Sequence, residues 1–419
     1  MRKPAGCFAI LFYVQVAFSQ ADTAQIIAPG RVNSAEQQQK PYVILISADG
    51  FRHDYAEKHG APSILALAKQ GVMADAMIPS YPSLTFPNHY SIVTGMYPSH
   101  HGLVNNNYYS FSRKQFYGMK DPLTIKDGTW YGGTPLWVLA EQQQMLSASF
   151  YWVGSEADIK GIHPTYHYPY NEKISMDKRI EVVLNWLRLP AEKRPHLICF
   201  YLPQVDHNGH MFGPDASQTK NAVQEVDHAV KQLYEAVHTT GLPVNFIFVG
   251  DHGMTSIDTV NTLQLPAFVD SSRFFIPRGA QLVELHAKDR RDIKPLYRKL
   301  KRNRDGFSVY LKKNMPAHLH YGRKDDVMNA IGDILLIPDW PRVFYARGRK
   351  PNPGAHGYDA TMFRDMHTIF YAWGPNFKKN LQVPAFENIH VYPVVTKILG
   401  LPYTEKIDGK PDLAEKITQ

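Results

Sequence analysis

The stretch YVILISADG (residues 42–50) is an unbroken apolar run that closes on an aspartate and a glycine. Apolar residues at every position, rather than at alternate ones, are typical of a strand buried on both faces of a sheet. The same pattern returns in HLICFYLPQVD (196–206) and VNFIFVGD (244–251). The sequence therefore predicts three buried strands that each lead into an aspartate, and these are Asp49, Asp206 and Asp251.

Amphipathic helices are predicted between the strands. SILALAKQG (63–71) ends at a glycine, and residues 221–241 place valine and leucine at helical spacing. Buried strands that alternate with such helices predict an α/β fold with a mainly parallel sheet. Ligands of such sheets bind beyond the carboxyl ends of the strands, so we expect the three aspartates to converge there.

The N-terminus is typical of an exported protein. Residues 1–19 combine a basic start with a short apolar run and small residues, which predicts a secretory signal peptide cleaved after Ser19. A membrane anchor is the alternative, but the run is shorter than the roughly 20 residues that a span needs. Residues 20–40 are polar and predict a flexible leader. We expect a secreted or periplasmic protein with no membrane span after cleavage.

The chain carries a formal net charge of +8, and part of it is concentrated in residues 288–304, where nine Lys/Arg face two Asp. Such a run could contact nucleic acid, but a solvated helix face is the commoner explanation. Aromatic side chains that could stack on bases are nearly absent from it, so no nucleic-acid partner is expected.

Aspartate and histidine occur together at two of the predicted strand ends, in DHNGH (206–210) and DHGM (251–254), and a further histidine lies in AHGYD (355–359). Carboxylate and imidazole ligands suit zinc, which takes about four ligands. Any single one of the 19 histidines is more often structural, so the joint pattern carries the prediction. The candidate ligands, too many for one ion and about right for two, are Asp49, Asp206, His210, Asp251, His252 and His356.

A threonine stands where a helix is predicted to begin, in TFPNHY (85–90). Pro87 suits the first helical turn, where the helix dipole favours negative charge on the Thr85 hydroxyl or on a bound phosphate. A threonine hydroxyl needs activation to become a nucleophile, and a two-metal site would supply it for an in-line phosphoryl displacement. The alternative is an ordinary N-cap threonine.

These motifs together resemble one family. ADGFR, TFPNHYSIVTGMYPSHHGLVNN, DHNGH, DHGM and AHGYD occur in the order and spacing of the nucleotide pyrophosphatase/phosphodiesterase family of the alkaline phosphatase superfamily. The resemblance extends from about residue 41 to 409. It implies an alkaline-phosphatase-like α/β sandwich, with a catalytic domain over 41–419 and an inserted cap at about 258–350. We call residues 258–350 the cap.

The resemblance also implies a role for each site residue. Thr85 is similar to the nucleophile that forms a phosphothreonine intermediate, and Asn106 to the asparagine that donates to a phosphate oxygen. Phe86 and Tyr201 are similar to the rings that stack a nucleobase. The residues similar to the ligands of two Zn²⁺ are Asp49, Thr85, Asp251 and His252 for one ion, and Asp206, His210 and His356 for the other.

The expected activity is hydrolysis of nucleotide phosphodiesters and pyrophosphates, with release of nucleoside 5′-monophosphates. We expect the protein to be a monomer. Two alternatives use the same metal site: a phosphodiesterase of lysophospholipids or choline-phosphate diesters, and a phosphomonoesterase. A third is an inactive protein that binds a phosphate ligand, although the nucleophile and all candidate ligands are present.

Overall fold

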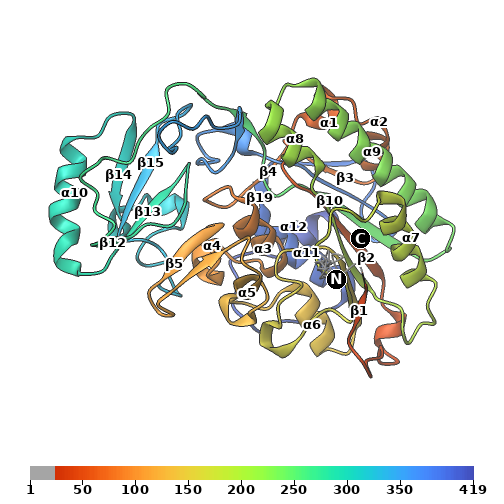
Figure 1. The fold of residues 1–419 in the computed structure, drawn as a ribbon. Helices are drawn as coiled ribbons and strands as arrows, with labels where there is room; N and C mark the ends of the chain where they lie inside the picture. Colours follow the sequence, from red (N-terminus) through yellow and green to blue (C-terminus); the bar gives the residue numbers. More distant parts are fainter. Residues whose placement is uncertain (1–23) are drawn as a thin grey trace, which may run out of the picture.

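The computed structural model describes residues 24–419, so the predicted signal peptide at 1–19 lies outside the described residues. Its centre is a nine-stranded sheet in which β8, β7, β9, β2 and β10 are parallel neighbours (Figure 1). This confirms the predicted α/β fold with a mainly parallel sheet. In spatial order the strands are β1 (Ile26–Ile27), β8 (Tyr166–His167), β7 (Ser147–Phe150), β9 (Leu197–Leu202), β2 (Tyr42–Ala48), β10 (Val244–Val249), β17 (Phe370–Trp373), β3 (Val72–Ala74) and β18 (Leu381–Val383).

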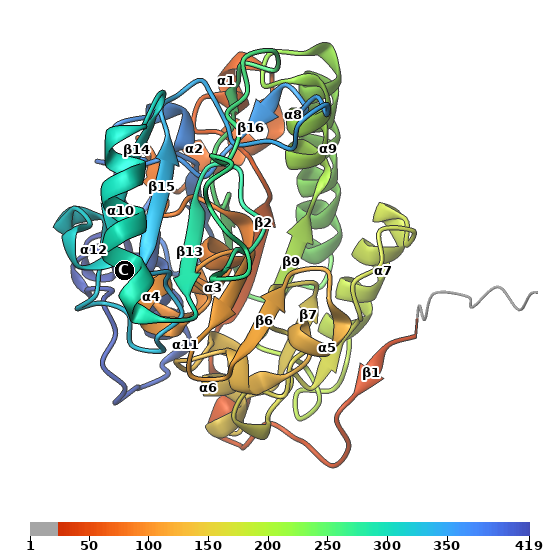
Figure 2. The ribbon, with the colours of Figure 1, turned by 60° about the vertical axis from the view of Figure 1, so that its left-hand side comes forward.

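Helices cover both faces of this sheet (Figures 1 and 2). Val43 and Leu45 of β2 face one hydrophobic core, and Ile44 and Ile46 face the other, because successive side chains of a strand point to opposite faces. The first core is completed by α3 (Thr85–Thr94), α6 (Leu136–Gln142), α11 (Val391–Leu399) and α12 (Asp412–Ile417). The second is completed by α1 (Tyr55–Lys58), α2 (Pro62–Lys69), α7 (Met176–Leu187) and α9 (Ser217–His238).

Shorter elements connect the layers. Outside the cap, the other α-helices of the described residues are α4 (Pro98–His101), α5 (Pro122–Ile125) and α8 (Gln204–Phe212). Three two-stranded sheets pair β5 (Asn107–Ser110) with β6 (Gln115–Gly118), β11 (Thr255–Ser256) with β16 (Gly354–Ala355), and β4 (Met77–Ile78) with β19 (Phe386–Glu387). Among the residues the structure describes, no helix has the length and apolar character to cross a bilayer.

The predicted flexible leader is docked onto the domain over its described residues, 24–40. Ile26–Ile27 pairs antiparallel with β8. Asn33 is 2% exposed, and its side-chain amide donates to the carbonyl oxygens of Ala191 and Arg194 at 2.8 and 2.7 Å. The expectation of flexibility was wrong here because the polar side chains satisfy backbone groups of the domain rather than water.

The cap contains a sheet of its own, separate from the large one (Figure 1). Its strands follow the antiparallel order β12 (Phe274–Phe275), β13 (Val283–Ala287), β15 (Ile334–Pro338) and β14 (Phe307–Leu311). The basic run forms α10 (Ile293–Arg302), which buries Leu296 and Leu300 against this sheet. The structure thus favours the solvated helix face as the explanation of the basic run.

A buried glutamate lies where the cap meets the main domain. Glu284 of β13 is 1% exposed, and its Oε1 accepts a hydrogen bond from the Tyr321 hydroxyl at 3.1 Å. That hydroxyl also lies 2.9 Å from the carbonyl oxygen of Val104, in the main domain. Burial raises the pKa of Glu284 to about 7.

Replacing Glu284 with Gln should make the stability of the protein less dependent on pH. The folded chain keeps a proton on Glu284 that the unfolded chain has lost, so its contribution is present at acidic pH and declines as the pH rises toward 7. Between pH 5 and 8 the wild type should lose on the order of 2 kcal/mol through this group. Thermal unfolding midpoints at both pH values measure the loss.

The Glu284→Gln variant should lack this component, and the exposed Glu225 of α9 offers a matched control through Glu225→Gln. A midpoint that falls equally in Glu284→Gln and in the wild type would contradict the assignment.

Candidate functional site

The three predicted aspartates meet at the carboxyl edge of the parallel strands. Asp49 directly follows β2, and Asp251 comes two residues after the end of its parallel neighbour β10. The backbone N–H of Asp206 donates to the carbonyl oxygen of Asp49 at 3.0 Å. The prediction that Asp206 lies at a strand end was wrong. Asp206 lies in the first turn of α8, because the extended chain ends after β9 and Pro203 occupies the N-cap position of this helix.

Helix α8 brings together two candidate ligands of the first group. Asp206 and His210 are four residues apart, so they share a face of the helix, and their Oδ1 and Nε2 atoms are 3.4 Å apart. His356 joins them from the loop after β16, with Nε2 3.6 Å from Asp206 Oδ1 and 3.0 Å from His210 Nε2. Gly209 permits close packing of this helix. It lies inside α8, where a Cβ would be 3.1 Å from Met254 Cε.

A second group lies beside the first. His252 Nε2 is 3.0 Å from Asp251 Oδ2 and 3.5 Å from Asp49 Oδ1. Gly50 allows the close approach, since its φ is +67° and a Cβ there would lie 2.8 Å from Asp206 Cα. The rings of His252 and His356 stack with centroids 3.5 Å apart, so the two groups adjoin.

Thr85 opens helix α3 without capping it. The N-cap position belongs to Leu84, and no side chain caps this helix, so the ordinary N-cap alternative for Thr85 is wrong. The Thr85 hydroxyl instead lies 3.2 Å from His252 Nε2. The structure therefore places this hydroxyl at the second group of candidate ligands.

Asn106 reaches the same helix start. Its Oδ1 accepts the backbone N–H of Phe86 at 3.0 Å, which orients the side chain. Within the described residues its Nδ2 group has no partner and is free to donate.

The two predicted stacking rings are partly exposed and do not touch one another within the described chain. Phe86 lies edge-on to Tyr117 at 6.4 Å. Tyr201 donates its hydroxyl hydrogen to Asp49 Oδ2 at 2.5 Å, and its ring lies 6.0 Å from that of Tyr170, which is 46% exposed. Tyr170 is an additional aromatic candidate that the sequence patterns did not single out.

The carboxylates are arranged as cation ligands. One oxygen of each is buried without a hydrogen-bond partner: Asp49 Oδ1, Asp206 Oδ1 and Asp251 Oδ2. Burial and the neighbouring carboxylates Asp251 and Asp206 raise the pKa of Asp49 well above its ordinary value. An unpaired buried carboxylate is costly, and a bound cation would relieve that cost.

The three histidines are oriented as metal ligands. The Nδ1 atoms of His210, His252 and His356 each lie 2.8 Å from a backbone carbonyl oxygen. A carbonyl oxygen only accepts, so each Nδ1 carries a hydrogen and each Nε2 is left facing the carboxylates. An imidazole that donates through Nδ1 and binds through Nε2 is the usual arrangement of metal-binding histidines. The ligand atoms of Asp206, His210 and His356 lie within 4.8 Å of one another, as do those of Asp49, Asp206 and His252.

His89 is a further residue of the site that was not predicted from the sequence. It lies one helical turn after Thr85, with Nδ1 3.0 Å from the Thr85 carbonyl oxygen and 3.3 Å from Asp251 Oδ2. Its Nε2 is 2.8 Å from the Ser47 hydroxyl. Both ring nitrogens are thus engaged, and the ring links α3, β2 and Asp251. The four-residue spacing from Thr85 was the available signal.

Comparisons with known proteins agree on one family. A family model described as type I phosphodiesterase / nucleotide pyrophosphatase matches residues 43–359. An uncharacterised pyrophosphatase/phosphodiesterase of Schizosaccharomyces pombe is 34% identical over 90% of this chain and 80% of its own length. Ectonucleotide pyrophosphatase/phosphodiesterase family member 1 of Rattus norvegicus is 33% identical over 87% of this chain, and a venom phosphodiesterase of Macrovipera lebetinus is 34% identical over the same share. The match covers only 41% and 44% of those two longer relatives.

Solved structures show the same fold. The human ectonucleotide pyrophosphatase/phosphodiesterase 5 superposes with a TM-score of 0.83 at 26% identity, over 91% of this chain and all of that one. A murine counterpart matches equally, at the same identity, TM-score and coverage. It is described as an inactive variant, with alanine in place of one threonine, in complex with AMP.

Removing the His89 ring should weaken divalent-cation binding. Groups that orient metal ligands typically contribute 10- to 100-fold to affinity, so we expect His89→Ala to raise the dissociation constant for Zn²⁺ by about that factor. Competition against a chromogenic chelator measures it. The buried His101, whose ring contacts the Ser91 hydroxyl and the Leu103 N–H, supplies the matched control through His101→Ala. An equal loss of Zn²⁺ affinity in both variants would show that His89 contributes only to packing.

Proposed function

The chain belongs to the type I phosphodiesterase/nucleotide pyrophosphatase family, and from this premise we propose that it hydrolyses nucleotide phosphodiester and pyrophosphate bonds and releases nucleoside 5′-monophosphates. One observation carries the proposal. The Thr85 hydroxyl stands 3.2 Å from His252 Nε2, beside buried carboxylate oxygens that have no hydrogen-bond partner. The proposed nucleophile and the candidate cation ligands therefore lie together.

We assign two zinc ions to the site, one held by Asp49, Thr85, Asp251 and His252, the other by Asp206, His210 and His356. Two Zn²⁺ against three carboxylates leave one positive charge, which suits an anionic phosphate. When bound, zinc supplies Lewis acidity that lowers the pKa of the Thr85 hydroxyl and stabilises the charge of the transferred phosphoryl group.

Thr85 gives its hydroxyl proton to solvent, and its Oγ attacks phosphorus in line with the leaving oxygen. As the new Oγ–P bond forms, the bond to the leaving oxygen breaks, and that oxygen keeps the electron pair. Water then attacks the phosphothreonine and adds its oxygen to phosphorus. As the Oγ–P bond breaks, one proton of the water passes to Oγ, which is released as the hydroxyl, and the other goes to solvent. The free Nδ2 group of Asn106 donates to a non-bridging oxygen in both steps, and the N-terminus of α3 favours the same negative charge.

Aromatic rings beside the site support a nucleotide substrate. We assign base stacking to Phe86 and Tyr201, which are both partly exposed, with Tyr170 at the edge of Tyr201. Stacking on such rings contributes about 1–3 kcal/mol per base. The murine relative in complex with AMP supports this assignment, since its structure superposes on most of this chain.

The relatives also support the covalent step and the location. The murine variant that lacks one threonine is described as inactive. Relatives named as ectoenzymes and venom enzymes agree with a secreted or periplasmic protein, which we propose to act as a monomer.

Replacing Thr85 with Ala should abolish turnover, since no other hydroxyl is proposed to attack. We expect kcat on the 4-nitrophenyl ester of thymidine 5′-monophosphate to fall by about a thousandfold or more. Thr85→Ser keeps a hydroxyl and should retain part of the activity. Zinc content, measured by atomic absorption, should stay above half of the wild-type value in both variants. Undiminished hydrolysis by Thr85→Ala would refute the mechanism.

Metal analysis tests the number of ions. Chelation should abolish activity, and zinc should restore it with about two ions bound per chain. His356→Ala removes a ligand of one ion only, so it should hold about one. The exposed His207, which lies next to Asp206 on α8, provides the control, because His207→Ala should still bind about two. A wild type that binds a single ion, or none, would overturn the two-metal assignment.

A further inference from the structure

A cavity of about 710 Å³ lies between the start of α3 and the cap. On the side of the main domain it is lined by Leu84, the residue before Thr85, and by Asn106. On the side of the cap it is lined by segments that contain Arg278 and Arg349. Its volume is that of a typical small-molecule site, so it can hold a substantial part of a substrate bound at Thr85.

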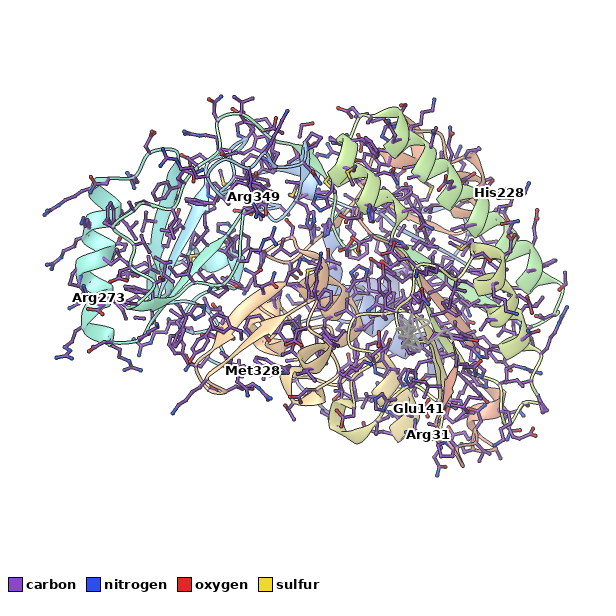
Figure 3. The ribbon with its side chains drawn as sticks, in the orientation of Figure 1. Arg31, Glu141, His228, Arg273, Met328 and Arg349 are labelled. Atoms are coloured by element: carbon purple, nitrogen blue, oxygen red, sulfur yellow. The ribbon has the colours of Figure 1, made fainter. Side chains whose placement is uncertain are left out.

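The cavity is positively charged. Arg278 and Arg349 are the charged residues among those that line it, and no carboxylate of the described chain is among them. Neither guanidinium has an ion pair or hydrogen bond within residues 24–419. Arg273, at the outer edge of the cap, is by contrast paired with Asp292, whereas Arg349 lies at the junction of cap and main domain (Figure 3).

The loop that contains Arg278 and the loop that contains Arg349 are joined to one another by hydrogen bonds. The backbone N–H of Phe344 donates to the carbonyl oxygen of Ala280 at 2.9 Å, two residues beyond Arg278. Leu263 donates to the carbonyl oxygen of Val343 at 2.8 Å and accepts from the N–H of Tyr345 at 2.9 Å. Backbone hydrogen bonds therefore hold both loops at the cavity.

The cavity lies on the leaving-group side of the site. A methyl group added to Gly357, the residue after His356, would lie 2.9 Å from Leu84 Cδ2 and 3.1 Å from Gln281 Cβ. Leu84 and Gln281 both line the cavity, so it adjoins the group of Asp206, His210 and His356. The Thr85 hydroxyl lies at the other group, beside His252. In-line displacement sends the leaving group away from the attacking oxygen, and therefore toward the cavity.

The charge of the cap agrees with an anionic leaving group. The cap holds 19 Lys/Arg and 10 Asp/Glu, whereas the whole chain holds 46 and 38. The cap therefore carries the entire positive excess of the chain. Such an asymmetry raises the local concentration of polyanions.

We propose that Arg278 and Arg349 bind a phosphate-bearing leaving group, which makes the enzyme selective for nucleoside polyphosphates over diesters with an uncharged leaving group. This inference rests on the proposed function. Guanidinium groups bind phosphate with two parallel hydrogen bonds, and an unpaired pair of them in one cavity matches the pyrophosphate that leaves a nucleoside triphosphate.

Two substrates with the same nucleoside test the proposal: thymidine 5′-triphosphate, and 4-nitrophenyl thymidine 5′-monophosphate. Both release thymidine 5′-monophosphate, but only the first has a phosphate-bearing leaving group. Each arginine-to-alanine substitution should lower kcat/KM on the triphosphate by about tenfold, and the double variant by about 100-fold. On the nitrophenyl ester all three variants should stay within about twofold of the wild type.

Arg298→Ala/Arg302→Ala is the matched control, because it removes two charges from the exposed face of α10. It should leave both substrates nearly unaffected. An undiminished rate of the Arg278→Ala/Arg349→Ala variant on the triphosphate, an equal loss on both substrates, or the same loss in the α10 control would each overturn the proposal.

Failure of the proposed function would appear differently. It would show as a wild type that turns over neither substrate, and calorimetric titration with inorganic pyrophosphate would then decide the arginine assignment alone. The wild type should bind pyrophosphate about 100-fold more tightly than the double variant, and equal binding would refute the assignment.

Discussion

Three carboxylates lie close together at the carboxyl edge of the parallel strands, and the histidines of the site stand where they can offset the mutual repulsion of these charges. Burial and the neighbouring charges of Asp251 and Asp206 raise the pKa of Asp49 well above its ordinary value. Burial alone would lower the pKa of His252, but the charges of Asp251 and Asp49 raise it to about 9. The fold tolerates such a concentration of like charge only because cations, or imidazolium in their absence, can compensate it.

The backbone fixes the directions of these groups before any ligand binds. Parallel pairing of β2 and β10 places Asp49 and Asp251 side by side, and one turn of α8 aligns Asp206 with His210. Backbone carbonyls then hold the histidine rings with the Nε2 atoms turned inward. Little reorganisation is required for such a site to act, which is the condition for effective electrostatic catalysis.

Much of this could be predicted from local patterns. Continuous apolar runs predicted the buried strands, and the strand-end rule led to Asp49 and Asp251. The helical position of Asp206 was missed because Pro203 and Gly209 are also typical of a loop, although Asp206 and His210 have helical spacing. The docked leader and the cavity arginines were beyond local prediction, because both depend on contacts between segments distant in sequence.

The docked leader has a further consequence for the large sheet. Ile26–Ile27 occupies the outer side of β8, whose unpaired backbone groups would otherwise offer a template for strand addition by another molecule. A chain shortened past Ile27 would therefore keep its core but expose a hydrogen-bonding edge, and self-association, rather than unfolding, is the defect to which it would be prone.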